Sequence, residues 1–154
     1  MKTVVSNSEA DTVRAAQKIA GIVKKGDVIA LFGTLGMGKT VFARAFVRAL
    51  GDEDEDVPSP TFTLVQTYDV TKDDVPVTVW HFDLYRLKSP EELYELGVEE
   101  AVDGISLIEW PENALPLLPP SRLEVRFDAE NTGTTRRLTF VPKGKNWEKR
   151  DIPV

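Results

Sequence analysis

Eight consecutive residues near the start of the chain have the types and spacing that bind the phosphates of a nucleotide. They satisfy the pattern G-x-x-x-x-G-K-[ST] and read Gly33, Thr34, Leu35, Gly36, Met37, Gly38, Lys39 and Thr40. The glycines allow successive backbone N–H groups to converge on phosphate oxygens. Lys39 is expected to reach the β- and γ-phosphates, and the Thr40 hydroxyl to bind magnesium. The sequence therefore predicts a site for a nucleotide with Mg²⁺.

Two carboxylates have a place from which they can assist the metal. Proteins with this loop usually need a second acidic residue at the end of a neighbouring buried strand. Glu109 ends the apolar run ISLIE, and Asp83 ends VTVWHFD, so both lie where ligands collect in α/β sheets. Both are candidate metal and catalytic residues. The alternative is a plain surface acid at a strand end. No apolar strand ends in the Asp–Glu pair of a classical Walker B motif, so the sequence does not identify the residue that orients water.

One segment of the chain resembles the guanine-binding motif of GTPases, but its position and context argue against that role. Residues Thr71 to Asp74 fit the pattern [NT]-K-x-D, but they fall at the expected tip of a hairpin rather than after a buried strand. No D-x-x-G sequence occurs anywhere in the chain to supply a switch glycine. The sequence therefore favours adenine, and ATP is the expected nucleotide.

The elements around the loop are those that its chemistry needs. The apolar run 27–32 predicts a strand buried on both faces. Apolar residues at helical spacing predict a helix over 39–50, which begins at the loop and turns its positive dipole end toward the phosphates. A second helix is expected over about 9–24, because Ser8 and Asp11 form a capping box in front of it.

The remainder of the chain predicts more strands than helices. Residues 61–69 and 77–83 are expected to form a hairpin, as are 122–128 and 135–141, with a short helix over 90–96 and a buried strand over 104–110 between them. We therefore predict an α/β fold of the P-loop type. It has one domain, residues 1–154, with a mixed, partly antiparallel sheet flanked by helices.

Composition excludes several classes of protein. The chain has no cysteine and a single histidine, so thiolate and multi-histidine metal sites are excluded. Its net charge of −6 argues against autonomous binding to nucleic acid. No apolar run is long enough to span a membrane, and the N-terminus has no apolar signal segment, so a cytoplasmic location is expected. His81 and Trp110 are expected to be packing residues, and 143–154 a loosely held basic tail.

Five motifs in order give the chain a resemblance to the TsaE (YjeE) family. They are GTLGMGKT, SPTFTLVQTY (59–68), HFDLYRL (81–87), SPEELYELG (89–97) and ISLIEWPE (105–112). The resemblance covers roughly residues 8 to 128. The family comprises small bacterial ATPases of the threonylcarbamoyladenosine tRNA-modification system.

The resemblance implies a role for individual residues. Thr40 and Glu109 would bind magnesium, with Asp83 near the metal and the γ-phosphate. Thr61 would belong to a switch-like loop that faces the γ-phosphate. The segment from Ser8 to Thr12, including Glu9, would pack near adenine. Val41 adjoins the loop among the nucleotide-binding residues; it replaces a frequent threonine of the family, as Met37 replaces a frequent alanine.

The resemblance also implies partners. The family works with the proteins TsaB and TsaD, so the chain would reach tRNA indirectly through their complex. Separately, we expect the chain to be a monomer when it is alone. We expect a slow ATPase, because no arginine finger is evident and a partner would complete the site. The alternatives are a module whose docking is controlled by nucleotide binding without essential hydrolysis, and a small-metabolite kinase.

Overall fold

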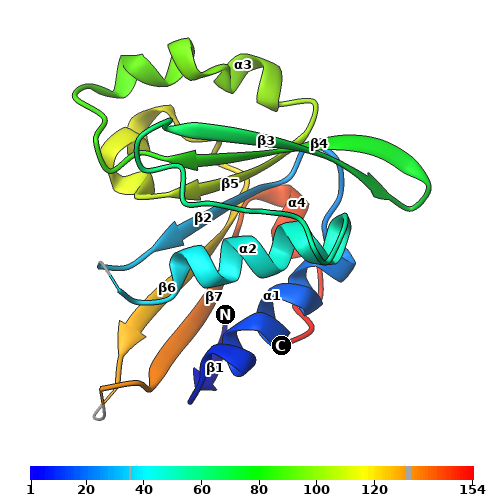
Figure 1. Ribbon diagram of the computed structural model, residues 1–154, viewed down its shortest axis with the longest axis vertical. Helices are drawn as coiled ribbons and strands as arrows, with labels where there is room; N and C mark the ends of the chain where they lie inside the picture. Colours follow the sequence, from blue (N-terminus) through cyan, green and yellow to red (C-terminus); the bar gives the residue numbers. More distant parts are fainter. Residues whose placement is uncertain (35, 131–132) are drawn as a thin grey trace.

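The computed structural model describes residues 1–34, 36–130 and 133–154. Within these residues seven strands form one mixed sheet in the order β1-β7-β6-β2-β5-β4-β3 (Figure 1). The strands are β1 (Lys2–Ser6), β2 (Val28–Phe32), β3 (Val65–Lys72), β4 (Val75–Asp83), β5 (Ile105–Glu109), β6 (Arg122–Ala129) and β7 (Arg136–Lys143). The predicted α/β fold with a mixed, partly antiparallel sheet is confirmed.

The centre of the sheet is parallel and buried on both faces. β2 pairs in parallel with β5 on one side and β6 on the other, and β5 pairs in parallel with β4. All five residues of β5 are buried, as are the first four of β2. This burial explains why both read as continuous apolar runs. Because β2, β4 and β5 point the same way, Phe32, Asp83 and Glu109 come to one edge of the sheet.

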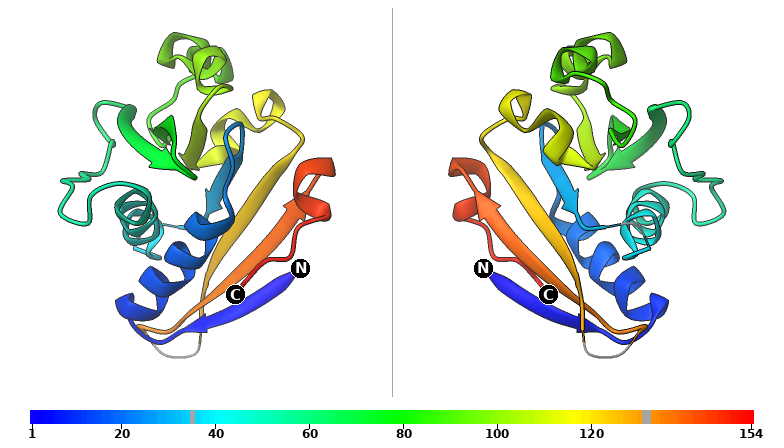
Figure 2. Two further views of the ribbon diagram at one scale, coloured as in Figure 1. Left: turned by 90° about the vertical axis from the view of Figure 1, so that its right-hand side faces the viewer. Right: turned by 90° about the vertical axis from the view of Figure 1, so that its left-hand side faces the viewer.

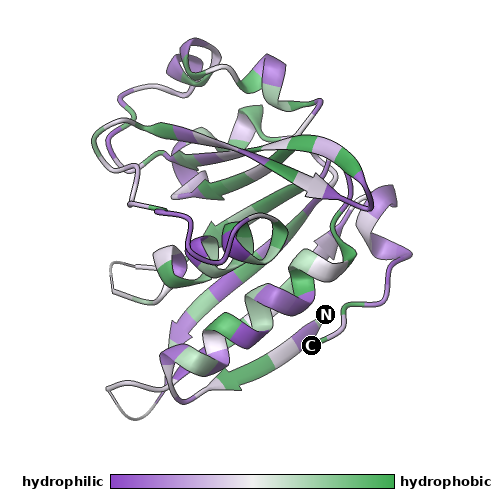
Figure 3. Cartoon of the chain, turned by 45° about the vertical axis from the view of Figure 1, so that its right-hand side comes forward, coloured by the Kyte–Doolittle hydropathy of each residue, from purple (hydrophilic) through white to green (hydrophobic). Residues whose placement is uncertain are grey.

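Helices cover the two faces of the sheet (Figure 2). α1 (Glu9–Ile22) and α2 (Lys39–Leu50) share one hydrophobic core with residues of six of the strands. The short helices η1 (Pro90–Leu96), α3 (Val98–Ala101) and η2 (Pro111–Leu117) cover the other face, over Phe82 and Ile108. Apolar residues accordingly alternate with polar ones along the helices that face the sheet (Figure 3). In the described part of the chain, no helix has the length and apolar character to cross a membrane.

The helix starts agree with the capping residues read from the sequence. The Ser8 side chain accepts from the backbone N–H of Asp11 at the start of α1, as the capping box predicts. Ser89 and Glu92 form a capping box with both of its hydrogen bonds, but the segment behind them is a 3-10 helix rather than an α-helix. The predicted helix 39–50 is confirmed at both ends.

Two features of the strands differ from the prediction. β1 was not predicted, and it pairs antiparallel with β7 from Lys2 to Ser6. The β3–β4 hairpin turns on two residues, Asp73 and Asp74, rather than on a seven-residue loop. Both have positive φ, 53° and 65°, as a type I′ turn requires. This tight turn extends each strand beyond its predicted end.

The C-terminal segment corrects the expectation of a loosely held tail. It begins with α4 (Lys145–Glu148), in which Trp147 is completely buried, and Ile152 is buried further along. The Arg150 guanidinium donates to both carboxylate oxygens of Asp27, over 2.6 and 2.7 Å. Figure 1 places the two chain ends near each other, and the Lys2 amine donates to the Ile152 carbonyl. The basic residues therefore anchor an apolar segment to the domain.

Candidate functional site

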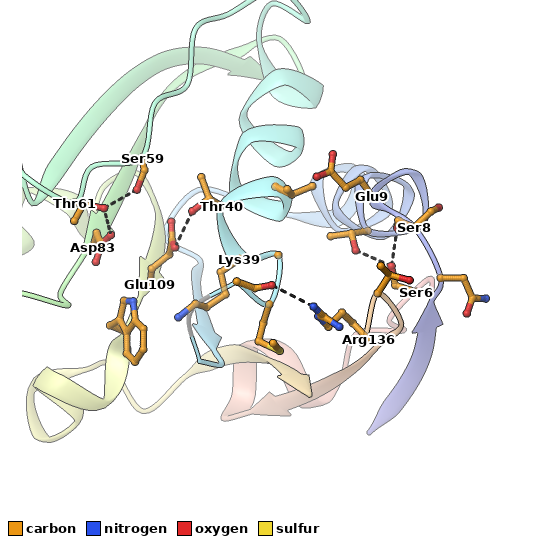
Figure 4. Close-up of a pocket in the computed structure, with 18 residues that line it drawn as sticks. Ser6, Ser8, Glu9, Lys39, Thr40, Ser59, Thr61, Asp83, Glu109 and Arg136 are labelled. Carbon is orange, nitrogen blue, oxygen red and sulfur yellow. Dashed lines mark hydrogen bonds between the residues drawn. The ribbon is translucent and has the colours of Figure 1, made fainter. Parts of the chain in front are cut away.

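A cavity of about 690 Å³ lies where β2, β4 and β5 end (Figure 4). Most of the predicted nucleotide and metal residues line it: Gly36, Met37, Gly38, Lys39, Thr40, Val41, Glu9, Thr12, Thr61, Asp83 and Glu109. Gly33 and Thr34 are not among its lining residues, and Leu35 lies outside the described residues. The fold thus brings together segments that the sequence indicated separately: the loop, the start of α1, the two strand ends and the segment that carries Thr61.

The loop after β2 leaves the start of α2 open toward the cavity. Gly38 is the N-cap residue, with φ of 100°, and no side chain in the described residues caps the helix. The first backbone N–H groups of α2 are therefore available to an anion, and the helix dipole favours one there. Gly33 is needed for a different reason. A Cβ at this position would lie 3.0 Å from the Phe127 Cβ and 3.1 Å from its carbonyl oxygen.

Lys39 points into the cavity from the first turn of α2 (Figure 4). Its residue is only 5% exposed, and Nζ donates to the Gly33 carbonyl over 2.5 Å. Burial lowers the pKa of the Lys39 amine below its ordinary value of 10.5, and the Glu109, Glu112 and Asp83 carboxylates oppose this shift. A phosphate group placed here would favour the charged amine.

Trp110 provides an aromatic face beside this amine. It precedes Pro111 and has a left-handed backbone, with φ of 55° and ψ of 48°, which is uncommon for a residue with a side chain. The Lys39 Nζ lies 3.6 Å from the centre of the indole ring, and the centre of the Tyr85 ring lies 4.8 Å from the centre of the Trp110 ring. The ring also packs against the apolar cluster under η2, so Trp110 does more than the packing expected from the sequence.

The two predicted carboxylates lie side by side. Asp83 and Glu109 are register partners across β4 and β5, and each is only 3% exposed. The Thr40 hydroxyl donates to Glu109 Oε1 over 3.2 Å, and the Thr61 hydroxyl donates to Asp83 Oδ2 over 3.2 Å. The loop that follows β2 and the loop that precedes β3 are thereby each tied to one carboxylate (Figure 4).

The side-chain oxygen atoms at the end of the cavity near Asp83 and Glu109 suit magnesium better than a softer metal. Mg²⁺ prefers oxygen ligands and is usually held by one or two carboxylates together with substrate phosphates. Thr40, Glu109 and Asp83 supply a hydroxyl and two carboxylates of this kind. No cluster of three or more His, Cys, Asp or Glu side chains that could hold a metal occurs among the described residues.

The opposite end of the cavity includes residues that the sequence did not indicate. Ser6, Asn7, Thr134 and Arg136 line it together with Glu9 and Thr12. The Ser6 and Thr12 hydroxyls are hydrogen-bonded over 2.7 Å. The Arg136 guanidinium lies next to the phosphate-binding loop and donates to the Gly36 carbonyl over 3.4 Å (Figure 4). In the sequence Arg136 is one of several scattered arginines, and nothing nearby in the chain marks it. Only the pairing of β7 with β1 and β6 brings it to the cavity.

Comparison with known proteins decides the family. The family model "Threonylcarbamoyl adenosine biosynthesis protein TsaE" matches residues 6–138. The chain belongs to the TsaE family. The tRNA threonylcarbamoyladenosine biosynthesis protein TsaE of Rickettsia conorii is 46% identical over 124 residues, 80% of this chain and 69% of that protein. The protein of the same name from Bacillus subtilis is 34% identical over 140 residues, 90% of this chain and 84% of that protein.

A solved structure supports the same conclusion. The crystal structure of YdiB from Bacillus subtilis matches with a TM-score of 0.74 and 30% sequence identity. The match covers 96% of this chain and 88% of the other. At this coverage the structural match extends beyond residues 6–138, to which the family model is matched. The P-loop fold predicted from the loop and its flanking strand and helix is confirmed.

Proposed function

We propose that this TsaE protein binds ATP with Mg²⁺ and hydrolyses it slowly, in support of tRNA threonylcarbamoyladenosine biosynthesis. The observation that carries the proposal is the hydrogen bond from Thr40 to Glu109. It joins the end of the phosphate-binding loop to a buried carboxylate on the neighbouring strand. A hydroxyl and a carboxylate at this position are the ligands that P-loop proteins use for magnesium.

Each part of the cavity has a role in this mechanism. The open start of α2 and the Lys39 amine bind the phosphate oxygens, so negative charge on the transferring phosphoryl group is stabilised by groups already in place. Magnesium, when bound, neutralises further charge on the phosphates. Thr61 donates to the Asp83 carboxylate. The loop that carries Thr61 therefore lies at the end of the cavity where the γ-phosphate would bind. The nucleoside lies at the end with Ser6, Thr12 and Arg136.

Slow turnover follows from the distribution of arginines. In the described residues, Arg136 is the only arginine that lines the cavity, and it lies at the end away from Glu109 and Asp83. An arginine at the γ-phosphate accelerates such reactions by roughly 10³–10⁵-fold in other P-loop proteins. We therefore propose that the partners TsaB and TsaD complete the site, that tRNA is reached through them, and that the chain acts as a monomer in the cytoplasm until it joins them.

Glu109→Gln tests whether hydrolysis is required. The substitution keeps the size of the side chain and one oxygen that can accept a hydrogen bond, but it removes the charge that would hold magnesium. We expect ATP hydrolysis to be lost, and with it the support of tRNA modification by TsaB and TsaD. If the variant no longer hydrolyses ATP but still supports modification, the protein is instead a module controlled by nucleotide binding alone.

A further inference from the structure

The one histidine of the chain lies against the carboxylate proposed to bind magnesium. His81 is on β4, two residues before Asp83, so the two side chains point to the same face of the sheet. Its register partner on β5 is Leu107, two residues before Glu109. The imidazole is completely buried, and its Nε2 lies 2.7 Å from Glu109 Oε2. An apolar residue would serve a purely packing role at this position equally well.

The hydrogen bond fixes how the carboxylate is turned. A carboxylate oxygen only accepts, so Nε2 of His81 donates to Glu109 Oε2. The other oxygen, Oε1, accepts from the Thr40 hydroxyl. Each carboxylate oxygen therefore has its own donor, and Oε1 is the one that faces the cavity with Thr40. Among the described residues, Nδ1 of His81 has no hydrogen-bond partner, so the contact with Glu109 is the polar function of this ring.

We propose that His81 is a positioning residue of the metal site. By holding Oε2, it keeps Oε1 of Glu109 aimed at Thr40 and at the position of the cation. This inference rests on the proposed function, because it concerns the carboxylate that would hold Mg²⁺. Removal of a side chain that hydrogen-bonds to a metal ligand and orients it typically costs about 10–100-fold in metal affinity or activity. Loss of the His81 donor leaves Oε2 buried and free to turn away.

A pair of substitutions separates the donor from the bulk of the ring. His81→Gln places an amide nitrogen at the same number of bonds from Cβ as Nε2, so it can still donate to Glu109. His81→Met has a chain of similar length without a donor. The measurement is the binding of ADP and of a non-hydrolysable ATP analogue by titration calorimetry, once with Mg²⁺ and once with EDTA, alongside the thermal midpoint of each variant.

We expect magnesium to tighten analogue binding to the wild type. In His81→Met this tightening falls by about 10–100-fold, while binding in EDTA stays as in the wild type, and His81→Gln retains the tightening. Equal tightening in all three proteins overturns the role of His81, as does a lower thermal midpoint without any change in tightening. If His81→Met does not fold, His81→Asn replaces it, because its amide is one bond too short to reach Glu109. Absence of tightening in the wild type itself contradicts the proposed function instead.

Discussion

Removal of Arg150 tests how firmly the C-terminal segment is attached. Its guanidinium makes two hydrogen bonds to Asp27, whose side chain is 3% exposed, and lies 4.1 Å from the centre of the Trp147 ring. In Arg150→Ala the carboxylate loses both of these bonds, and the backbone N–H of Lys24 still donates to it over 2.6 Å. Breaking a buried ion pair on one side costs roughly 3–5 kcal/mol.

The lower end of that range applies here, because the Arg150 side chain is 15% exposed and the bond from Lys24 remains. We therefore expect a loss of about 3 kcal/mol in the free energy of unfolding. For a domain of about 150 residues this lowers the thermal midpoint by roughly 6–12 °C.

Thermal unfolding followed by circular dichroism measures this shift. Asp151→Ala is the matched control, since it removes the neighbouring charge of the same segment, and this side chain is 90% exposed. We expect the control to change the midpoint little. Asp27 and the phosphate-binding loop lie at opposite ends of β2. Arg150→Ala should therefore leave nucleotide affinity unchanged at temperatures where the variant is folded. A midpoint no lower than that of Asp151→Ala would refute the view that this ion pair anchors the segment.

Three further predictions concern single residues. Gly21→Ala in α1 should raise stability by about 0.5–1 kcal/mol in urea unfolding, because a Cβ there meets nothing within 4 Å. Arg136→Ala should weaken ADP binding about tenfold, or ~1.4 kcal/mol, in calorimetry; unchanged affinity would remove Arg136 from the site. Burial lowers the pKa of the free Lys39 amine, and a bound phosphate favours the charged amine. Nucleotide binding should therefore be accompanied by proton uptake at Lys39 and should weaken as the pH rises through that lowered pKa. Lys39→Arg, whose guanidinium stays charged, should bind nucleotide without this pH dependence.

The parts of the site predicted from the sequence depend on local patterns. The phosphate-binding loop, α2 behind it and the buried strand in front of it are adjacent in the chain, so spacing alone indicated them. Asp83 and Glu109 were found because each ends an apolar run, and parallel strands bring such ends to one edge. The cap at Ser8 was likewise read from a four-residue pattern.

The parts that the sequence did not predict depend on contacts between distant residues. β1 is an edge strand of five residues, and only its pairing with β7 defines it. The same pairing brings Ser6 to the cavity, and β7 itself delivers Arg136. The tail reads as charged and exposed until Trp147 and Ile152 are seen in the core, with Arg150 paired to a residue 123 positions earlier. His81 reads as a packing residue until Glu109 is placed on the neighbouring strand.

The most direct test of the central claim is ATP hydrolysis by the protein alone, and then with TsaB, TsaD and tRNA, with Lys39→Ala as the blank. The account predicts slow hydrolysis by the isolated chain, strong stimulation by the complex, and neither in the variant. Tight binding of ATP with Mg²⁺ but no stimulation would contradict a site completed by these partners. Equal hydrolysis by Lys39→Ala would contradict the assignment of the phosphate-binding loop.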